Sequence, residues 1–214
     1  MGRRASLICK FCVSGSHRKS SVYNRCIMLA VLASIGILSS AQAPADLYQP
    51  KGPVLRFTMV SGGNFEITTD PKRSPKTVSH IIALVRKGFY DRLRVHRVEW
   101  WVTQWGAPAS KDQPMDVKNP KTGKMEQNEK VGDGGSGKDI PVFEGSRDVD
   151  FYRGVVGVAS TGLQVPGDSQ LFILKKDALR LYNSYAVVGK VTKGLDVVGR
   201  IQRGDRIRKA VVLP

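Results

Sequence analysis

The 214-residue sequence is poor in the side chains that most often carry out covalent or metal chemistry. It has three cysteines and three histidines, and the cysteines Cys9, Cys12 and Cys26 all lie within the first 43 residues. Cys9 and Cys12 have the spacing of a metal or redox pair, but no fold is predicted around them. Only His80 and His96 remain after residue 43, so no cluster has the ligand spacing of a metal site. We therefore expect no metal and no cofactor, and the lack of cysteine in that part suits an oxidising compartment.

Apolar runs long enough to cross a membrane are also lacking. The apolar run from Ile27 to Leu38 has 12 residues, whereas a membrane-spanning helix needs about 20. Six basic residues precede this run, and residues 1–43 contain no acidic residue. The run is followed by Ala41-Gln42-Ala43, which fits a signal-peptide cleavage site. We predict that residues 1–43 are an export leader and that the mature protein is periplasmic or extracellular, without stable membrane insertion. An uncleaved signal anchor and a later start at Met28 are the alternatives.

Acidic residues are the scarcer charge: 18 stand against 34 basic ones, a net charge of +16. Without residues 1–43 the count is 28 basic and 18 acidic, a net charge of +10. Such an excess can serve nucleic acid or another anionic partner. The basic residues are scattered, however, and the sequence has no aromatic–basic ribonucleoprotein motif or arginine-rich tract. We interpret the charge as a solvated basic surface and expect no nucleic-acid partner.

The pattern after a linker at residues 44–53 predicts a mainly β domain. Alternating apolar residues bounded by turn residues are typical of short strands. We expect strands at 54–60, 64–69, 94–99, 101–105, 154–160, 170–174, 185–191 and 207–213. Many short strands with two or three helices favour a closed eight-stranded antiparallel barrel with the helices capping it.

One predicted helix has clear end signals. Ser74 is a good N-cap, Pro75 suits the first helical position, and Gly88 lies where the helix should end. His80 lies beside the apolar stripe of this helix and is interpreted as structural. Shorter helices are expected at 177–181 and 195–201. The polar, glycine-rich residues 107–140 are expected to form a long functional or mobile loop.

Two short segments resemble motifs of other protein classes, a serine protease and a phosphate-binding loop, but each lacks a residue that the motif requires. Gly167-Asp168-Ser169, with His96 upstream, follows the His…Asp…Ser order of trypsin-like proteases. Gln170 follows the serine where that family has Gly-Gly, so the oxyanion hole would be missing. Gly132-Asp133-Gly134-Gly135 is not a phosphate-binding loop, because no Lys-Ser/Thr pair follows it onto a helix.

The informative residues are an arginine within an apolar strand and a glutamine seven positions later. The segment Val95-His96-Arg97-Val98 precedes Gln104, and the runs Ser169-Gln170-Leu171-Phe172-Ile173 and Gly189-Lys190-Val191 follow downstream. With Ser74-Pro75-Lys76-Thr77-Val78, these segments resemble the cyclophilins, a family of peptidyl-prolyl cis-trans isomerases. The resemblance runs from about Val54 to the C-terminus.

This resemblance implies a cyclophilin-like domain at 54–214, of the bacterial exported type. The implied activity is isomerisation of X–Pro bonds in proline-containing peptides and folding client proteins, by a monomer without cofactor. Arg97 resembles the family's catalytic arginine, and Gln104 the glutamine that hydrogen-bonds the substrate backbone. The remaining implied substrate-binding residues are Phe172 at the pocket floor, Trp101, Val102 and Leu181 as apolar walls, Tyr185, and Ala159 and Ser160 on the strand edge that pairs with substrate.

The chain departs from the family pattern near these residues. It is one residue short between Arg97 and Gln104, which affects the alignment of Trp101 and Val102. Trp105 stands where the family has glycine and is expected to crowd the pocket rim. A second hypothesis is therefore a proline-peptide binding or scaffold module with weak or no turnover.

Overall fold

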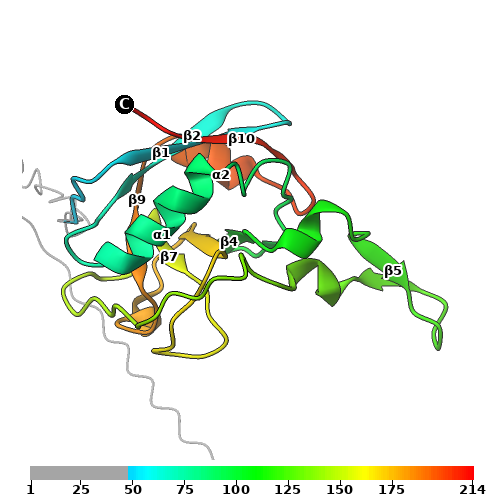
Figure 1. The fold of residues 1–214 in the computed structure, drawn as a ribbon. Coiled ribbons are helices and arrows are strands. Elements are labelled where there is room, and N and C mark those ends of the chain that lie inside the picture. Colours follow the sequence, from blue (N-terminus) through cyan, green and yellow to red (C-terminus); the bar gives the residue numbers. More distant parts are fainter. Residues whose placement is uncertain (1–47) are drawn as a thin grey trace, which may run out of the picture. The chain divides into compact units, whose positions relative to one another are not determined.

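An eight-stranded antiparallel sheet forms the body of the protein (Figure 1). The computed structural model describes residues 48–214, so the predicted leader lies outside the described residues. The strands follow the order β10-β1-β2-β9-β7-β8-β4-β3. Their bounds are β1 Val54–Met59, β2 Asn64–Thr69, β3 Arg97–Val98, β4 Val102–Trp105, β7 Val155–Val158, β8 Leu171–Leu174, β9 Val187–Lys193 and β10 Ile207–Val212. Each predicted strand is present, with β3 much shorter than expected.

The sheet is curled, and the closed barrel that we expected is not confirmed. The end strands β10 and β3 are not paired with each other as strands. Because β3 has only two residues, the chain before it meets the start of β10 through one isolated bridge, between Arg94 and Arg206, and a few backbone hydrogen bonds. One of these joins the Val95 amide to the Asp205 carbonyl oxygen at 2.8 Å. The fold is thus a mainly β half-barrel with few helices.

Helix α1 (Pro75–Arg86) packs against β10, and the shorter α2 (Leu195–Arg200) packs against β2. Ser74 occupies the N-cap position of α1, as predicted, but its side chain makes no capping hydrogen bond. The Glu144 carboxylate does so instead, accepting from the backbone amides of Lys76 at 3.0 Å and Thr77 at 2.7 Å. A carboxylate at this end also interacts favourably with the helix dipole. A residue 67 positions away from Thr77 therefore completes the helix.

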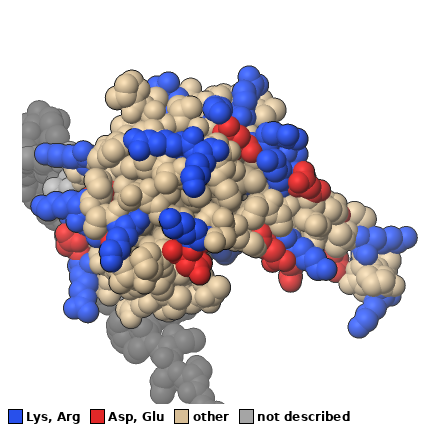
Figure 2. Space-filling model, viewed as in Figure 1, with Lys and Arg blue, Asp and Glu red and all other residues tan. Residues whose placement is uncertain are grey.

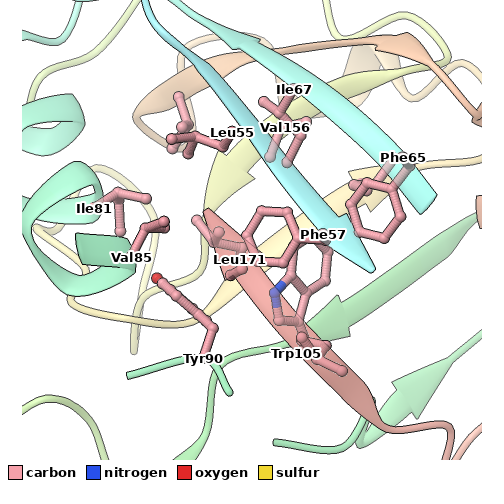
Figure 3. Packing of buried hydrophobic residues seen from close by; sticks show 14 of the residues in the cluster. Leu55, Phe57, Phe65, Ile67, Ile81, Val85, Tyr90, Trp105, Val156 and Leu171 are labelled. Carbon is pink, nitrogen blue, oxygen red and sulfur yellow. The ribbon is translucent and has the colours of Figure 1, made fainter. Parts of the chain in front are cut away.

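Aromatic rings fill the core enclosed by the sheet and α1 (Figure 3). Phe57 on β1 stacks on Phe65 on β2 at 5.2 Å between ring centroids, and Trp105 meets Phe57 edge-on at 5.4 Å. Only 1% of Trp105 is exposed. The expectation that Trp105 crowds the pocket rim is therefore wrong. As the last residue of β4, it points to the opposite face from Gln104, because side chains alternate along a strand.

Residues 107–140 contain more regular structure than the sequence suggests. A 3₁₀ turn, η1 (Pro108–Lys111), leads into a hairpin of β5 (Asp116–Lys118) and β6 (Met125–Gln127), and η2 (Glu129–Gly132) follows. The hairpin projects from the body of the molecule (Figure 1). At its base, Arg203 Nη1 donates to Asp116 Oδ1 at 2.9 Å. The long insertion thus forms a projecting hairpin with regular secondary structure, rather than an irregular loop.

Basic side chains are spread over the visible face, with acidic ones between them (Figure 2). Several pair locally: Arg73 contacts both Asp70 at 2.7 Å and Asp148 at 2.8 Å. Within residues 48–214, no helix is long and apolar enough to span a bilayer.

Candidate functional site

All nine residues singled out from the sequence line one small cavity of about 190 Å³. Arg97 comes from β3, Val102 and Gln104 from β4, and Phe172 from β8. The other five lie outside the strands: Trp101 directly before β4, Ala159 and Ser160 directly after β7, Leu181 at the end of the 3₁₀ turn η3 (Leu179–Leu181), and Tyr185 two residues before β9. The shorter spacing between Arg97 and Gln104 does not displace Trp101 or Val102 from the cavity. Their individual roles stay predictions.

Strand register brings the central residues into one row. Arg97 on β3 lies opposite Gln104 on β4, Gln104 lies opposite Phe172 on β8, and Phe172 lies opposite Gly157 on β7. Directly opposed residues in an antiparallel sheet point to the same face. A charged, an amide and an aromatic side chain therefore lie side by side along this row.

Arg97 provides the positive charge at the edge of the cavity. Its side chain is 46% exposed, and its Nη1 donates to Gln104 Oε1 at 3.3 Å. The guanidinium carbon also lies 5.7 Å from the centre of the Trp101 ring, whose other neighbour is Arg180 at 4.4 Å. Contacts with an aromatic ring favour a cation in this position. Arg97 is thus oriented by neighbours yet open to a ligand.

Phe172 is a deeply buried aromatic residue among those that line the cavity. It is 5% exposed and meets Tyr185 edge-on at 5.4 Å and Phe151 in a stacked arrangement at 6.4 Å. The ring lies over Gly157, where an added Cβ would come within 2.5 Å of it. The absence of a side chain at position 157 therefore allows the ring to lie this deep.

Gln170 belongs to the site as well, although sequence reasoning gave it no role. It directly precedes β8, and its side chain hydrogen-bonds Gln104 and the backbone of Gly132 and Gly134. The signal was present in the sequence, because residues two apart on an extended strand share a face and Phe172 was already assigned to the pocket.

A larger cavity of about 920 Å³ adjoins the first and shares Gln104, Ala159 and Ser160 with it. Its other walls are the glycine-rich segment 132–141 and the segment 161–170. Asp168 joins these walls: its carboxylate accepts from the backbone amide and hydroxyl of Ser136 and contacts His80 Nε2 at 2.9 Å. His80 is thus part of this cluster in the structure, consistent with the structural role predicted for it.

A model of the family described as cyclophilin type peptidyl-prolyl cis-trans isomerase/CLD matches residues 54–213. The chain belongs to the cyclophilin family. A relative from Brucella abortus, named a probable peptidyl-prolyl cis-trans isomerase, is 32% identical over 185 residues, or 86% of this chain and 88% of the relative. Peptidyl-prolyl cis-trans isomerase B of Bacillus subtilis is 28% identical, over 73% of this cyclophilin and 95% of the relative.

Solved structures agree on the fold. A crystal structure of a Cryptosporidium parvum cyclophilin type peptidyl-prolyl cis-trans isomerase has a TM-score of 0.59 with this cyclophilin, at 18% sequence identity. The match covers 76% of this chain and 98% of that one. A second structure of the same parasite protein was determined in the presence of the dipeptide Ala-Pro, with a TM-score of 0.58.

The remaining polar groups of this cyclophilin do not form a protease site. Ser169 is fully buried, and its hydroxyl donates to the Gly106 carbonyl oxygen at 2.9 Å. Asp168, the neighbouring carboxylate, contacts His80 instead of His96. Burial, with Arg97 and Arg203 nearby, lowers the pKa of His96 to about 4. His96 is therefore uncharged near neutral pH and adds no charge beside Arg97.

Proposed function

We propose that this cyclophilin isomerises X–Pro peptide bonds with Arg97 as the group that stabilises the twisted peptide. The observation that carries the proposal is the row of Arg97, Gln104 and Phe172 on one face of the sheet, where all three line one small cavity. Family membership and the names of its relatives support the activity itself.

The physical task is to weaken amide resonance. Rotation about a peptide bond has a barrier of about 18–20 kcal/mol, because the C–N bond has partial double-bond character. Halfway through the rotation, the nitrogen regains its lone pair and becomes a hydrogen-bond acceptor. A fixed cationic donor stabilises that state more than the planar ground state, which is the condition for catalysis. Arginine suits this role because its guanidinium is rigid and stays charged.

The cavity would hold the proline while its bond rotates. The ring would rest on Phe172 between Val102 and Leu181, whose apolar surfaces exclude water. Gln104 would donate to a carbonyl oxygen of the substrate backbone, and the edge at Ala159 and Ser160 would pair with the residues before proline. No cofactor takes part in this mechanism. The Ala-Pro dipeptide used with the Cryptosporidium structure supports a proline-containing peptide as the ligand.

The test is exchange NMR on a short X–Pro peptide with the chain from Pro44 onward. The parent should accelerate exchange, and Arg97→Ala should reduce kcat/KM by about 10²–10³-fold, the range for removing one oriented donor to a developing charge. Peptide affinity should change by less than about threefold, since the apolar pocket is intact. A matched control is Arg180→Ala, which removes the second guanidinium over Trp101 but leaves Arg97 and Gln104 unchanged. Its rate should stay within about threefold of the parent.

The same measurement also tests the alternative function. A parent that binds the peptide but leaves its exchange rate unchanged would identify a proline-peptide binding or scaffold module. If Arg97→Ala turns over as fast as the parent, Arg97 has no part in the mechanism, although the protein remains an enzyme.

The cellular setting is a second part of the proposal. Residues 1–43 have the composition of an export leader, and the three cysteines are confined to them. We therefore infer that a monomer without cysteine acts on folding client proteins in the periplasm or outside the cell, without nucleic-acid or stable membrane contact. Mass spectrometry of the protein from an exporting host should show an N-terminus at Pro44. A chain that retains residues 1–43 in the membrane fraction would indicate the uncleaved anchor.

A further inference from the structure

Helix α1 and residues 136–141 form the walls of a groove of about 690 Å³, here called the α1 groove. It shares no residue with the small cavity around Arg97, and the proposed function assigns it no role. Its helical wall extends from Pro75 to Lys87. A helix rises by about 1.5 Å per residue, so this wall is about 18 Å long and matches about five extended residues. The α1 groove therefore has the size of a peptide site.

Apolar side chains line the inside of the α1 groove. Leu84 on the helix and Ile140 on the opposite wall are buried, Phe89 is half-buried, and Ala83 is exposed. A concave apolar surface favours a ligand that brings apolar groups of its own, because contact removes both surfaces from water. The ligand of the α1 groove should therefore carry apolar side chains.

Lysines are the main charged groups around this apolar surface. Lys76 and Lys87 come from the helical side and Lys138 from the opposite wall, and all three are exposed. None of their ammonium groups forms an ion pair within residues 48–214. Asp139 is the one carboxylate among the residues that line the groove, and α1 contains no acidic residue. The charge of the α1 groove therefore complements an acidic ligand.

Two sets of hydrogen bonds hold the walls of the α1 groove together. Asp168 accepts from the amide and hydroxyl of Ser136 on one wall and contacts His80 Nε2 on the other at 2.9 Å. Glu144, three residues after the second wall, accepts from two amides at the start of α1 at 3.0 and 2.7 Å. The groove is thus built before a ligand arrives, which limits the ordering cost of binding.

The chain itself offers no matching occupant. Residues 1–43 contain six basic residues and no acidic one, so the lysines repel this segment. Residues 44–214 contain 28 basic and 18 acidic residues, and this excess of positive charge disfavours a second copy in the same way. The α1 groove instead fits a segment of a different, acidic protein.

We propose that the α1 groove binds an extended acidic segment of a client protein, with carboxylates against the three lysines and apolar side chains against Leu84 and Ile140. That the partner is a client rests on the proposed function. The groove shares Asp139–Pro141 with the cavity of about 920 Å³, which adjoins the cavity around Arg97. A client held in the α1 groove therefore keeps its prolines at a high effective concentration near Arg97.

The probe is the labelled, proline-free peptide acetyl-Glu-Leu-Glu-Glu-Leu-Glu-amide, with binding measured by fluorescence anisotropy. The parent should bind it, and a peptide with glutamine in place of every glutamate should bind at least about tenfold more weakly. The double variant Lys87→Gln/Lys138→Gln should raise the Kd by about fivefold, the sum of two exposed ion pairs. The matched control is Lys121→Gln/Lys124→Gln, the same charge change at exposed lysines of the β5–β6 turn, which should stay within about twofold of the parent.

Ala83→Arg separates docking in the α1 groove from general charge attraction. This variant fills the groove while adding a positive charge, and arginine is a good helix former. Docking predicts a Kd at least about fivefold higher than that of the parent, whereas charge attraction alone predicts a lower one. A lower Kd, equal loss in the two lysine double variants, or no binding by the parent would overturn the proposal. Thermal unfolding of each variant shows whether the fold is retained.

Two further measurements separate this proposal from the proposed function. Arg97→Ala should bind the acidic peptide as the parent does, and saturating acidic peptide should leave the turnover of a short X–Pro peptide within about twofold. Competition between the two peptides would place the acidic one in the cavity around Arg97 and refute the α1 groove. If the parent binds the acidic peptide but turns over no X–Pro peptide, the proposed function fails and the groove stands.

Joining the two peptides through a flexible linker tests whether the groove serves clients. The joined substrate should have a KM about tenfold lower than the short X–Pro peptide, with kcat unchanged, because the groove adds binding that is equal in the ground and transition states. Lys87→Gln/Lys138→Gln should remove most of this gain. An unchanged KM would show that the acidic ligand of the α1 groove is not part of a client.

Discussion

At the residue scale, the shape of the cavity depends on the contact between Phe172 and Gly157. The two lie opposite each other on β8 and β7, and the ring occupies the space that a side chain at position 157 would fill. The geometry of the row on β3, β4 and β8 is therefore sensitive to a single methyl group.

We predict that Gly157→Ala displaces the Phe172 ring and weakens peptide binding. The added Cβ would lie 2.5 Å from the ring, and overpacking of this kind costs about 1–3 kcal/mol of folding free energy. The proline would lose its flat floor, so the peptide Kd should rise by about fivefold or more. Urea unfolding and an NMR titration with the X–Pro peptide measure the two effects.

The control is Gly199→Ala in α2, where an added Cβ meets nothing within 4 Å. Alanine is the better helix former, so this variant should be neutral or slightly more stable. If Gly157→Ala binds peptide as the parent does, Phe172 is not the floor of the pocket.

The sequence predicted the residues around the cavity better than it predicted their surroundings. The nine residues were implied by the resemblance to the cyclophilins, and strand register brings three of them, Arg97, Gln104 and Phe172, together. Trp105 was misplaced because the family comparison placed it at the rim, whereas alternation along β4 turns it into the core. Gln170 was missed although it stands two positions from Phe172, because two of its three hydrogen-bond partners are backbone carbonyl groups, of Gly132 and Gly134, which no side-chain pattern marks.

At the element scale, α1 shows how a local signal can be right in position and wrong in cause. Ser74 marks the start of the helix, yet the capping acceptor is the carboxylate of Glu144. The insertion at 107–140 shows elements that have no local signal at all. Asn119 and Gly123 form the turn of the β5–β6 hairpin, but strands of three exposed residues show no pattern of buried and exposed positions. Elements without an apolar face cannot be predicted from hydrophobic periodicity.

We predict that Glu144→Ala destabilises the protein by about 1 kcal/mol or more, the usual effect of removing a helix cap. Two amides at the start of α1 lose their acceptor, and the negative charge near the positive end of the helix dipole is lost. Glu144→Gln keeps one acceptor oxygen and should have the smaller effect. Urea unfolding of both variants at neutral pH measures the difference.

A suitable comparison is Glu126→Ala on β6, because that exposed carboxylate hydrogen-bonds the hairpin residues Asn119 and Thr122 and no other side chain in residues 48–214. Its free energy of unfolding should stay within about 0.5 kcal/mol of the parent. Equal destabilisation by the Glu144 and Glu126 variants would show that capping of α1 contributes nothing.

At the scale of the whole molecule, the curled sheet brings distant segments together at its open ends. We predicted a closed barrel from the number of short strands. Strand β3 has only two residues, however, and does not pair with β10. Nothing in the sequence of residues 94–99 indicated that only two of them form a strand. The same region contains His96, which lies between the short strand and the insertion. Its Nδ1 atom is buried without a hydrogen-bond partner among residues 48–214.

We predict that His96 makes the stability of the fold depend on pH. Its pKa is about 4 in the folded protein and ordinarily 6.5, mainly because burial disfavours the charged imidazolium and secondarily because Arg97 and Arg203 repel it. Between these values, the unfolded chain takes up a proton that the folded protein does not. The free energy of unfolding is therefore highest above pH 6.5 and falls as the pH decreases toward 4.

The expected loss between pH 7.5 and pH 5 is about 2 kcal/mol from this residue. Urea unfolding of the parent and His96→Gln at both pH values isolates it, since His80 and the carboxylates are common to the two proteins and their contributions cancel. The variant should lose less stability than the parent over this interval.

Equal losses would mean that His96 is hydrated in the folded protein and titrates near its ordinary pKa. In that case an imidazolium beside Arg97 would compete with the guanidinium for acceptors at acidic pH, and isomerisation by the parent would fall below pH 6.5 while that by His96→Gln would not. The two measurements together therefore determine whether the environment of His96 keeps Arg97 as the only cation in the row of Arg97, Gln104 and Phe172.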